Sequence, residues 1–220
     1  MTTLVGILLI ALPVAFNVAF AALARAFDYP DILRRPTSEI LERFRAGGSR
    51  LVTLWWAFAM TALAFAPVAV LVSAVLDGDA TVLRLAATVG VLAGLVQLLG
   101  LLRWPFLVPY LARVDADASP ARREAVDVVF QAFHRYLGVA VGEHLGYLLT
   151  GAWSVLVGVA LAPGWLGLVG IVIGALLMLC SLEFVGRFEP AGWRLAGTLV
   201  PVIYVAWSLW LAGVGVALLL

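Results

Sequence analysis

Long stretches of apolar residues alternate with short polar segments along the whole chain. A helix needs about 20 apolar residues to cross the hydrocarbon core of a membrane, and a backbone in lipid is satisfied only within helices or closed barrels. Pro163-Gly164 divides one uncharged run that is too long for a single helix. The pattern predicts an all-α integral membrane bundle of six transmembrane helices forming one domain, residues 1–220. The expected spans are about 4–26, 51–76, 81–103, 137–161, 165–186 and 194–218.

Two of the polar segments have the spacing of amphipathic helices. After Pro36, the apolar residues Ile40, Leu41 and Phe44 fall on one helical face, and Gly47-Gly48 follows as a helix stop. Ser119-Pro120 begins the other amphipathic stretch, which runs into the fourth span and bends near Gly138. We expect short interfacial helices on the cytoplasmic side, the first of them lying on the inner leaflet. A plain cytosolic loop is the alternative for that first segment.

Composition removes the soluble and nucleic-acid-binding classes. Hydrophobic residues make up 64% of the chain and charged residues 12%, with a mean hydropathy of +1.09, whereas soluble domains are about half apolar and a quarter charged. The net charge is +1 without a basic block, so no nucleic-acid partner is expected. The single cysteine, Cys180, excludes a disulfide scaffold.

The distribution of arginine predicts the orientation. With six spans, thirteen of the 14 basic residues fall on one side, and only Arg84 falls on the other. The positive-inside rule places the thirteen in the cytoplasm and both termini outside. The chain lacks lysine and is rich in Ala, Leu, Val and Gly, as expected of a GC-rich bacterial genome. We therefore expect a multi-pass protein of the bacterial cytoplasmic (inner) membrane, in contact with the lipid bilayer.

The fourth span contains a stripe of small residues at Gly138, Gly142 and Gly146. This spacing lets another helix approach closely in lipid. The third span has a shorter version at Gly90 and Gly94, so these two helices are expected to touch. The sequence alone leaves open whether the stripe packs within one chain or forms a homo-oligomer.

Polar residues within the spans point to a pocket open to the cytoplasm. Glu143 is costly inside a membrane and usually faces protein or water. Several other polar residues lie at a similar depth. The pocket candidates are Glu143, His144, Tyr147, Arg103, Glu183, Gln97, Tyr204 and His134. In the alternative interpretation, Glu143 and Glu183 reach the interface or make structural ion pairs with Arg103 or Arg187.

No metal or other cofactor is expected. The two histidines are His134 and His144, and neither H-E-x-x-H nor C-x-x-C occurs. At 100° per residue, His134 and Glu143 point in opposite directions on a helix. Adjacent Glu143 and His144 do not converge on one ion from a straight helix.

Three segments resemble a family of uncharacterised bacterial membrane proteins, grouped as a domain of unknown function. These segments are Phe27-Asp28-Tyr29-Pro30-Asp31-Ile32-Leu33-Arg34, Leu102-Arg103-Trp104-Pro105-Phe106-Leu107-Val108-Pro109, and residues 134–144 (HRYLGVAVGEH). The resemblance spans nearly the whole chain. It implies a polytopic membrane protein and no activity or catalytic residue.

Three classes of function remain. The first is a binding or regulatory module whose pocket holds a lipidic or amphipathic ligand. The second is an enzyme using Glu143 and Glu183 as acid and base on a lipid-borne substrate, near Tyr147 or Tyr204. The third is a small transporter, against which the outer halves of the first, second and sixth spans offer no polar path. The binding module is the favoured hypothesis.

Overall fold

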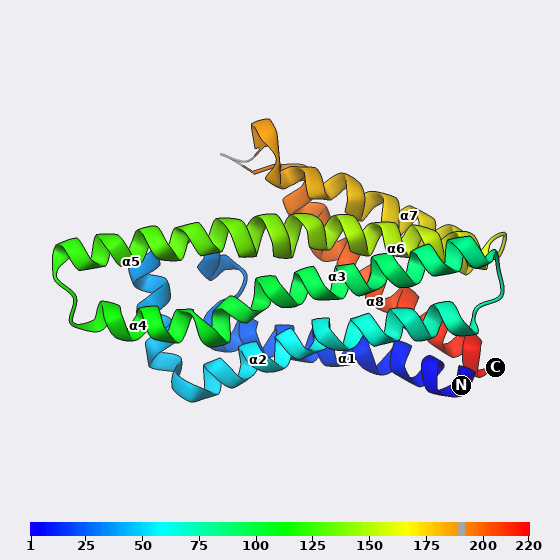
Figure 1. Cartoon of the computed structure of the whole chain (residues 1–220), viewed down its shortest axis with the longest axis horizontal. Helices are drawn as coiled ribbons and strands as arrows, with labels where there is room; N and C mark the ends of the chain where they lie inside the picture. Colours follow the sequence, from blue (N-terminus) through cyan, green and yellow to red (C-terminus); the bar gives the residue numbers. More distant parts are fainter. Residues whose placement is uncertain (189–191) are drawn as a thin grey trace.

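The computed structural model describes residues 1–188 and 192–220 (Figure 1), and these are helical with short connections and no strands. The longer helices are α1 (Thr2–Phe27), α2 (Thr37–Val75), α3 (Ala80–Phe106), α4 (Val108–Ala116), α5 (Pro120–Phe133), α6 (Gly146–Leu161), α7 (Trp165–Cys180) and α8 (Arg194–Leu219). A π-helix, η2 (His134–Leu145), joins α5 to α6. The 3₁₀ turns are η1 (Asp31–Arg34), η3 (Ser181–Phe184) and η4 (Gly186–Phe188).

Six helical stretches in the described residues are long and apolar enough to cross a membrane, which confirms the predicted fold class. Their bounds are wider than expected at three places. The second stretch begins at Thr37 rather than near 51, because it includes the amphipathic segment before Gly48. The third stretch continues through α4 to Ala116, and the fourth begins at Pro120 rather than near 137. The reason is that the amphipathic segment 120–133 enters the span without a break. The fifth stretch ends at Phe184, slightly before the expected 186.

The six stretches form a closed ring in chain order. Each packs on the next (α1 on α2, α2 on α3, α3 on α6, α6 on α7, α7 on α8), and α1 packs on α8 to close the ring. Figure 1 shows both termini at the same end as the α2–α3 and α6–α7 turns. We call this the termini end. The opposite end, formed by the connections 28–36 and 107–119 (the latter largely α4), is the arginine-rich end.

Close backbone approach holds α6 against α7. A Cβ atom on Gly151 would lie 2.5 Å from the Gly174 carbonyl oxygen, and a Cβ on Gly158 would lie 2.7 Å from the Gly167 carbonyl oxygen.

At the termini end, the Asp79 carboxylate caps α3 by accepting from the amides of Thr81 (2.8 Å) and Val82 (3.0 Å). These two backbone donors lower the pKa of Asp79 below its ordinary value.

The predicted amphipathic helix at 37–47 is present, but its apolar face does not lie on the inner leaflet. Gly48, at φ 55° and ψ −150°, breaks α2 after this segment and turns the helix over the end of the bundle. Ile40, Leu41 and Phe44 are fully buried against the protein itself. The physical reason is that the arginine-rich end of the ring offers these side chains an apolar core of its own.

Two aromatic clusters fill the centre of the ring. The termini-side cluster comprises Phe65, Trp153, Trp207 and Trp210, with centroid distances of 4.9–6.4 Å between contacting rings. The arginine-side cluster comprises Phe27, Phe44, Trp55 and Trp104, in which Trp55 and Trp104 stack at 4.5 Å. Membrane interfaces enrich tryptophan, yet Trp104 is a core residue that is 1% exposed.

Candidate functional site

A polar layer lies between the two aromatic clusters. It comprises Tyr29, Arg103, Glu143, Tyr147 and Tyr204, contributed by the α1–η1 connection, α3, η2, α6 and α8. At one side of the layer the Tyr29 ring lies 5.0 Å from Trp55, and at the other the Tyr204 ring lies 6.2 Å from Trp207. Glu143 lies close enough for its charge to influence the ionisation of four groups, those of Tyr29, Arg103, Tyr147 and Tyr204. Three of the ring's helical stretches and the α1–η1 connection therefore contribute to one polar region.

Arg103 is held by the protein on several sides. Its guanidinium donates from Nη1 to the Gly100 carbonyl oxygen, and its Nη2 lies 3.3 Å from Nδ1 of His134. The same group lies 5.1 Å from the Trp104 ring centroid, within cation–π range. Since arginine only donates, Nδ1 of His134 accepts and the ring proton resides on Nε2. Arg103 is 8% exposed, so its positive charge is buried but largely satisfied.

Glu143 lacks a direct partner among the described residues. Its carboxylate makes no hydrogen bond there and no ion pair within 4 Å, although the charges of Arg103 and Glu183 act on it. Within the described part of the chain, the fully buried side-chain polar atoms without a hydrogen bond are Nε1 of Trp55 and of Trp153. Glu143 is half-buried and has no atom in that set. Its carboxylate oxygens are therefore not fully enclosed.

The three tyrosines of the polar layer also have hydroxyls without a hydrogen-bond partner among the described residues. The Tyr147 and Tyr204 rings lie 5.5 Å apart. In the part of the chain that the structure describes, the hydroxyls of Tyr29, Tyr147 and Tyr204 make no hydrogen bond, and none is fully enclosed. Burial, and after it the charge of Glu143, raises the pKa of Tyr29 well above its ordinary value, which keeps this hydroxyl protonated. The layer thus offers three hydroxyls and one carboxylate without partners.

The π-helix η2 places His134 and Glu143 differently from the sequence-based expectation. The prediction that they point in opposite directions assumed 100° per residue, and this assumption is wrong for His134–Leu145. In the structure His134 contacts Arg103, and Glu143 lies within the range of the Arg103 charge. Hydrogen bonding from residue i to i+5 puts more residues in each turn, and such segments occur frequently at functional sites. Nothing in the sequence pattern signals the π-helix.

Three other pocket candidates have structural roles or lie at the margin. Nε2 of Gln97 donates to Thr150 Oγ1 (3.1 Å), which joins α3 to α6. Nδ1 of His144 donates to the Ser181 carbonyl (2.8 Å) at the end of α7. Glu183 is half-buried and its charge acts on Glu143. The Arg187 side chain lies outside the described residues, so its predicted ion pair stays a prediction.

The glycine stripe packs within the chain. A Cβ on Gly138 would lie 2.6 Å from Cζ of Arg103, so this glycine makes room for the guanidinium. Gly142 meets Gly100, and Gly146 meets Gln97. The predicted contact between the third and fourth spans is therefore confirmed, with α3 covering the whole stripe.

The two glycines of the shorter stripe, Gly90 and Gly94, do not both contact the fourth span. Gly90 faces Trp153 of α6 and Ala69 of α2, whereas Gly94 faces the α2 backbone at Ala62 and Ala66. Only part of the shorter stripe thus contributes to the contact with the fourth span.

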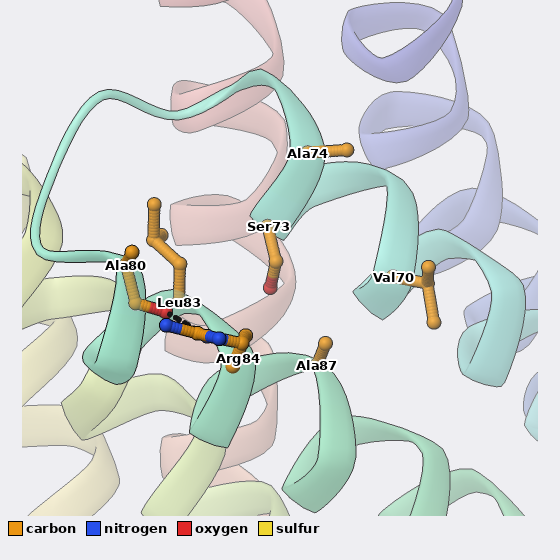
Figure 2. A pocket seen from close by; sticks show the side chains of 7 residues that line it. All are labelled: Val70, Ser73, Ala74, Ala80, Leu83, Arg84 and Ala87. Atoms are coloured by element: carbon orange, nitrogen blue, oxygen red, sulfur yellow. Dashed lines mark hydrogen bonds between the residues drawn. The ribbon is translucent and has the colours of Figure 1, made fainter.

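A cavity of about 420 Å³ at the termini end has fewer polar groups available for a ligand than the polar layer has. Figure 2 shows it between α2 and α3, lined by Val70, Ser73, Ala74, Ala80, Leu83, Arg84 and Ala87. Ser73 Oγ donates to the Ala69 carbonyl (3.1 Å), and Arg84 Nε donates to the Ala80 carbonyl (3.0 Å), the bond dashed in Figure 2. Both polar side chains are thus engaged by their own helices. No three His, Cys, Asp or Glu residues of the described segments are grouped to hold a metal ion.

Comparison with known proteins yields one match. A family model described as a domain of unknown function, DUF4386, matches residues 4–215. No curated protein and no solved structure matches the chain.

Proposed function

Since the chain belongs to the DUF4386 family, a domain of unknown function, we propose from the geometry of the polar layer that it is a binding module for an amphipathic molecule. The headgroup occupies the space beside Glu143, and the apolar tail lies along the bundle. The observation that supports this proposal is the set of uncommitted groups, one carboxylate and three hydroxyls, that are not fully enclosed among helices long enough to cross a membrane. Polar groups at such depth are costly and are typically functional.

The state of the two charged residues indicates which headgroup fits. Arg103 already contacts Gly100 and His134 and is almost fully buried. Glu143 is uncommitted and, when ionised, only accepts hydrogen bonds. A tyrosine hydroxyl donates or accepts. The layer therefore favours an uncharged headgroup with hydroxyl donors over an anionic one.

The termini-side aromatic cluster supports binding over transport. Its Trp153 is completely buried, and Trp207 and Trp210 are 7% and 3% exposed. The indole N–H of Trp207 donates to Ser154 Oγ (2.9 Å), and that of Trp210 donates to the Leu166 carbonyl (2.8 Å). A solute leaving the polar layer toward the termini end would have to displace this packed cluster.

An acyl glycerol tests the binding proposal directly. In phosphatidylcholine nanodiscs, we expect tritiated 1-monododecanoylglycerol to bind at least about tenfold more tightly than methyl dodecanoate, because it alone carries hydroxyls and each bond to a charged group contributes about 1.5–3 kcal/mol. Tyr147→Phe or Tyr204→Phe should weaken binding by about fivefold, the equivalent of one hydrogen bond of about 1 kcal/mol. Scintillation proximity measures both affinities.

Tyr136→Phe is the matched control, because Tyr136 lies on η2 but is 69% exposed. This variant should bind as the unmodified protein does. Equal affinity for the two probes, or equal losses in all three tyrosine variants, contradicts the binding proposal. Release of dodecanoate by the unmodified protein but not by Glu143→Gln would favour the enzyme, for which Glu183 acting on Glu143 supplies a second carboxyl group.

We also propose that the protein resides in a bacterial inner membrane with both termini outside. A reporter enzyme that is active only in the cytoplasm should give no signal when fused after Leu220. The same reporter inserted at Asp117, at the arginine-rich end, should be active. The thirteen-to-one distribution of arginine supports this orientation. Strong activity of the Leu220 fusion would reverse it.

A further inference from the structure

A second hollow lies at the arginine-rich end, between α1 and the bend of α2. Its volume of about 560 Å³ falls in the range of about 300–1,000 Å³ that is typical of small-molecule sites. The lining residues are Ala22, Arg25, Ala26, Ala46, Gly47, Arg50, Leu51 and Leu54. We call this the α1–α2 groove.

Small residues and one backbone bend keep the groove open. Ala22 and Ala26 line it from α1, and Ala46 and Gly47 line it from the short helical segment of α2. Gly48 has a positive φ of 55°, a conformation that other residues rarely adopt. The helical axis of α2 changes direction there, and the buried Leu51 lines the bottom of the groove.

The two arginines of the groove differ from the other four between residues 25 and 50. Those four are engaged by acidic side chains of the same segment or by the Ala112 carbonyl. They are Arg34, Arg35, Arg43 and Arg45. Arg25 and Arg50 are exposed and have no ion pair or hydrogen bond among the described residues. The groove thus holds two uncompensated positive charges.

The groove has an apolar part and a cationic part, which match the acyl chain and the phosphate of a phospholipid. Ala22 and Leu54 belong to the apolar parts of α1 and α2, whereas Arg25, Ala46 and Arg50 lie toward the arginine-rich end. Guanidinium groups bind phosphate oxygens in a bidentate manner, and basic pockets between transmembrane helices bind anionic headgroups.

We propose that the α1–α2 groove binds an anionic phospholipid, with its phosphate between Arg25 and Arg50 and one acyl chain along Ala22 and Leu54. The site is separate from the polar layer, and its ligand is charged where that of the polar layer is not. The two proposals are therefore tested by different measurements.

Native mass spectrometry of the detergent-purified protein tests this site, with dioleoyl phosphatidylglycerol as the probe. We expect one tightly retained lipid. Arg25→Gln/Arg50→Gln should weaken its binding by about 25-fold, because each basic residue at a membrane surface contributes about fivefold. Arg122→Gln/Arg123→Gln is the matched control. It removes the same charge from exposed α5 residues that have no partner in the described part of the chain, and it should change binding less than twofold.

Two further arms separate a lipid from a free anion. Ala26→Leu keeps both arginines but fills the groove, so it should weaken phosphatidylglycerol binding about tenfold. Dioleoyl phosphatidylcholine and inorganic phosphate should be retained poorly by every form of the protein. Equal retention of phosphatidylcholine, equal losses in the two double variants, or unimpaired lipid binding by Ala26→Leu would each overturn the proposal. Tight binding of inorganic phosphate alone would assign the arginines to a soluble anion instead.

Discussion

Gly100→Ala should lower the free energy of unfolding by about 2–3 kcal/mol, because overpacking a tight contact costs about 1–3 kcal/mol and here the neighbours are backbone. The added Cβ would lie 2.6 Å from the Gly142 Cα and 2.9 Å from the Leu137 carbonyl oxygen. Neither atom can move aside as a side-chain end would, so α3 and η2 must separate. Reversible unfolding in mixed micelles measures the change.

Gly213→Ala is the control for this substitution. Gly213 is also helical, but its Cβ would meet Leu166 at an ordinary 3.4 Å. Its effect should stay within about 0.5 kcal/mol. Because Gly100 and Gly142 belong to the same chain, the loss in Gly100→Ala should not depend on protein concentration. A concentration-dependent loss would instead indicate that the stripe joins two copies.

Arg103→Gln should destabilise the protein by about 3–5 kcal/mol, the usual cost of removing one member of a buried charged arrangement. The shorter amide loses the cation–π contact with Trp104 and cannot serve both the Gly100 carbonyl and His134 Nδ1. It also leaves the negative charge of Glu143 without the positive charge that acts on it. The same unfolding measurement reports this loss.

A double-mutant cycle identifies the partner. If Arg103 compensates Glu143, Arg103→Gln/Glu143→Gln should cost at least about 1 kcal/mol less than the sum of the two single variants. Arg113→Gln, an exposed arginine of α4, is the control and should change stability by less than about 0.5 kcal/mol. Additive losses would show that Arg103 is held by Gly100, His134 and Trp104 independently of Glu143.

The spans were predictable from the sequence because in lipid the length of an apolar run determines where a helix can cross. The stop near Gly48 was equally visible, since glycine there follows an amphipathic face. The contact of the fourth span with the third was expected from two glycine stripes. The residues that meet the longer stripe, Arg103, Gly100 and Gln97, lie outside the shorter one and depend on side-chain positions that a pattern does not contain.

The assembly of the polar layer was only partly predictable. Depth along each helix suggested that Arg103, Glu143, Tyr147 and Tyr204 lie at one level. Tyr29 was missed because it lies outside the apolar runs, and only the fold turns it inward against Trp55. The burial of the 37–47 face was also missed, because a hydrophobic face has the same pattern whether lipid or protein covers it.

The π-helix also fixes a rotational phase between the two halves of the fourth stretch. Each residue of an α-helix advances its side chain by about 100° around the axis. The wider turn of a π-helix advances each residue by less, so restoring α-helical bonding over His134–Leu145 without changing its length would turn α5 relative to α6. Phe130, which now contacts Trp104 at 6.3 Å, would swing away from the core, and Arg122 and Arg123 would face another direction. The π-helix thus sets the angle between α5 and α6 as well as the distance between them.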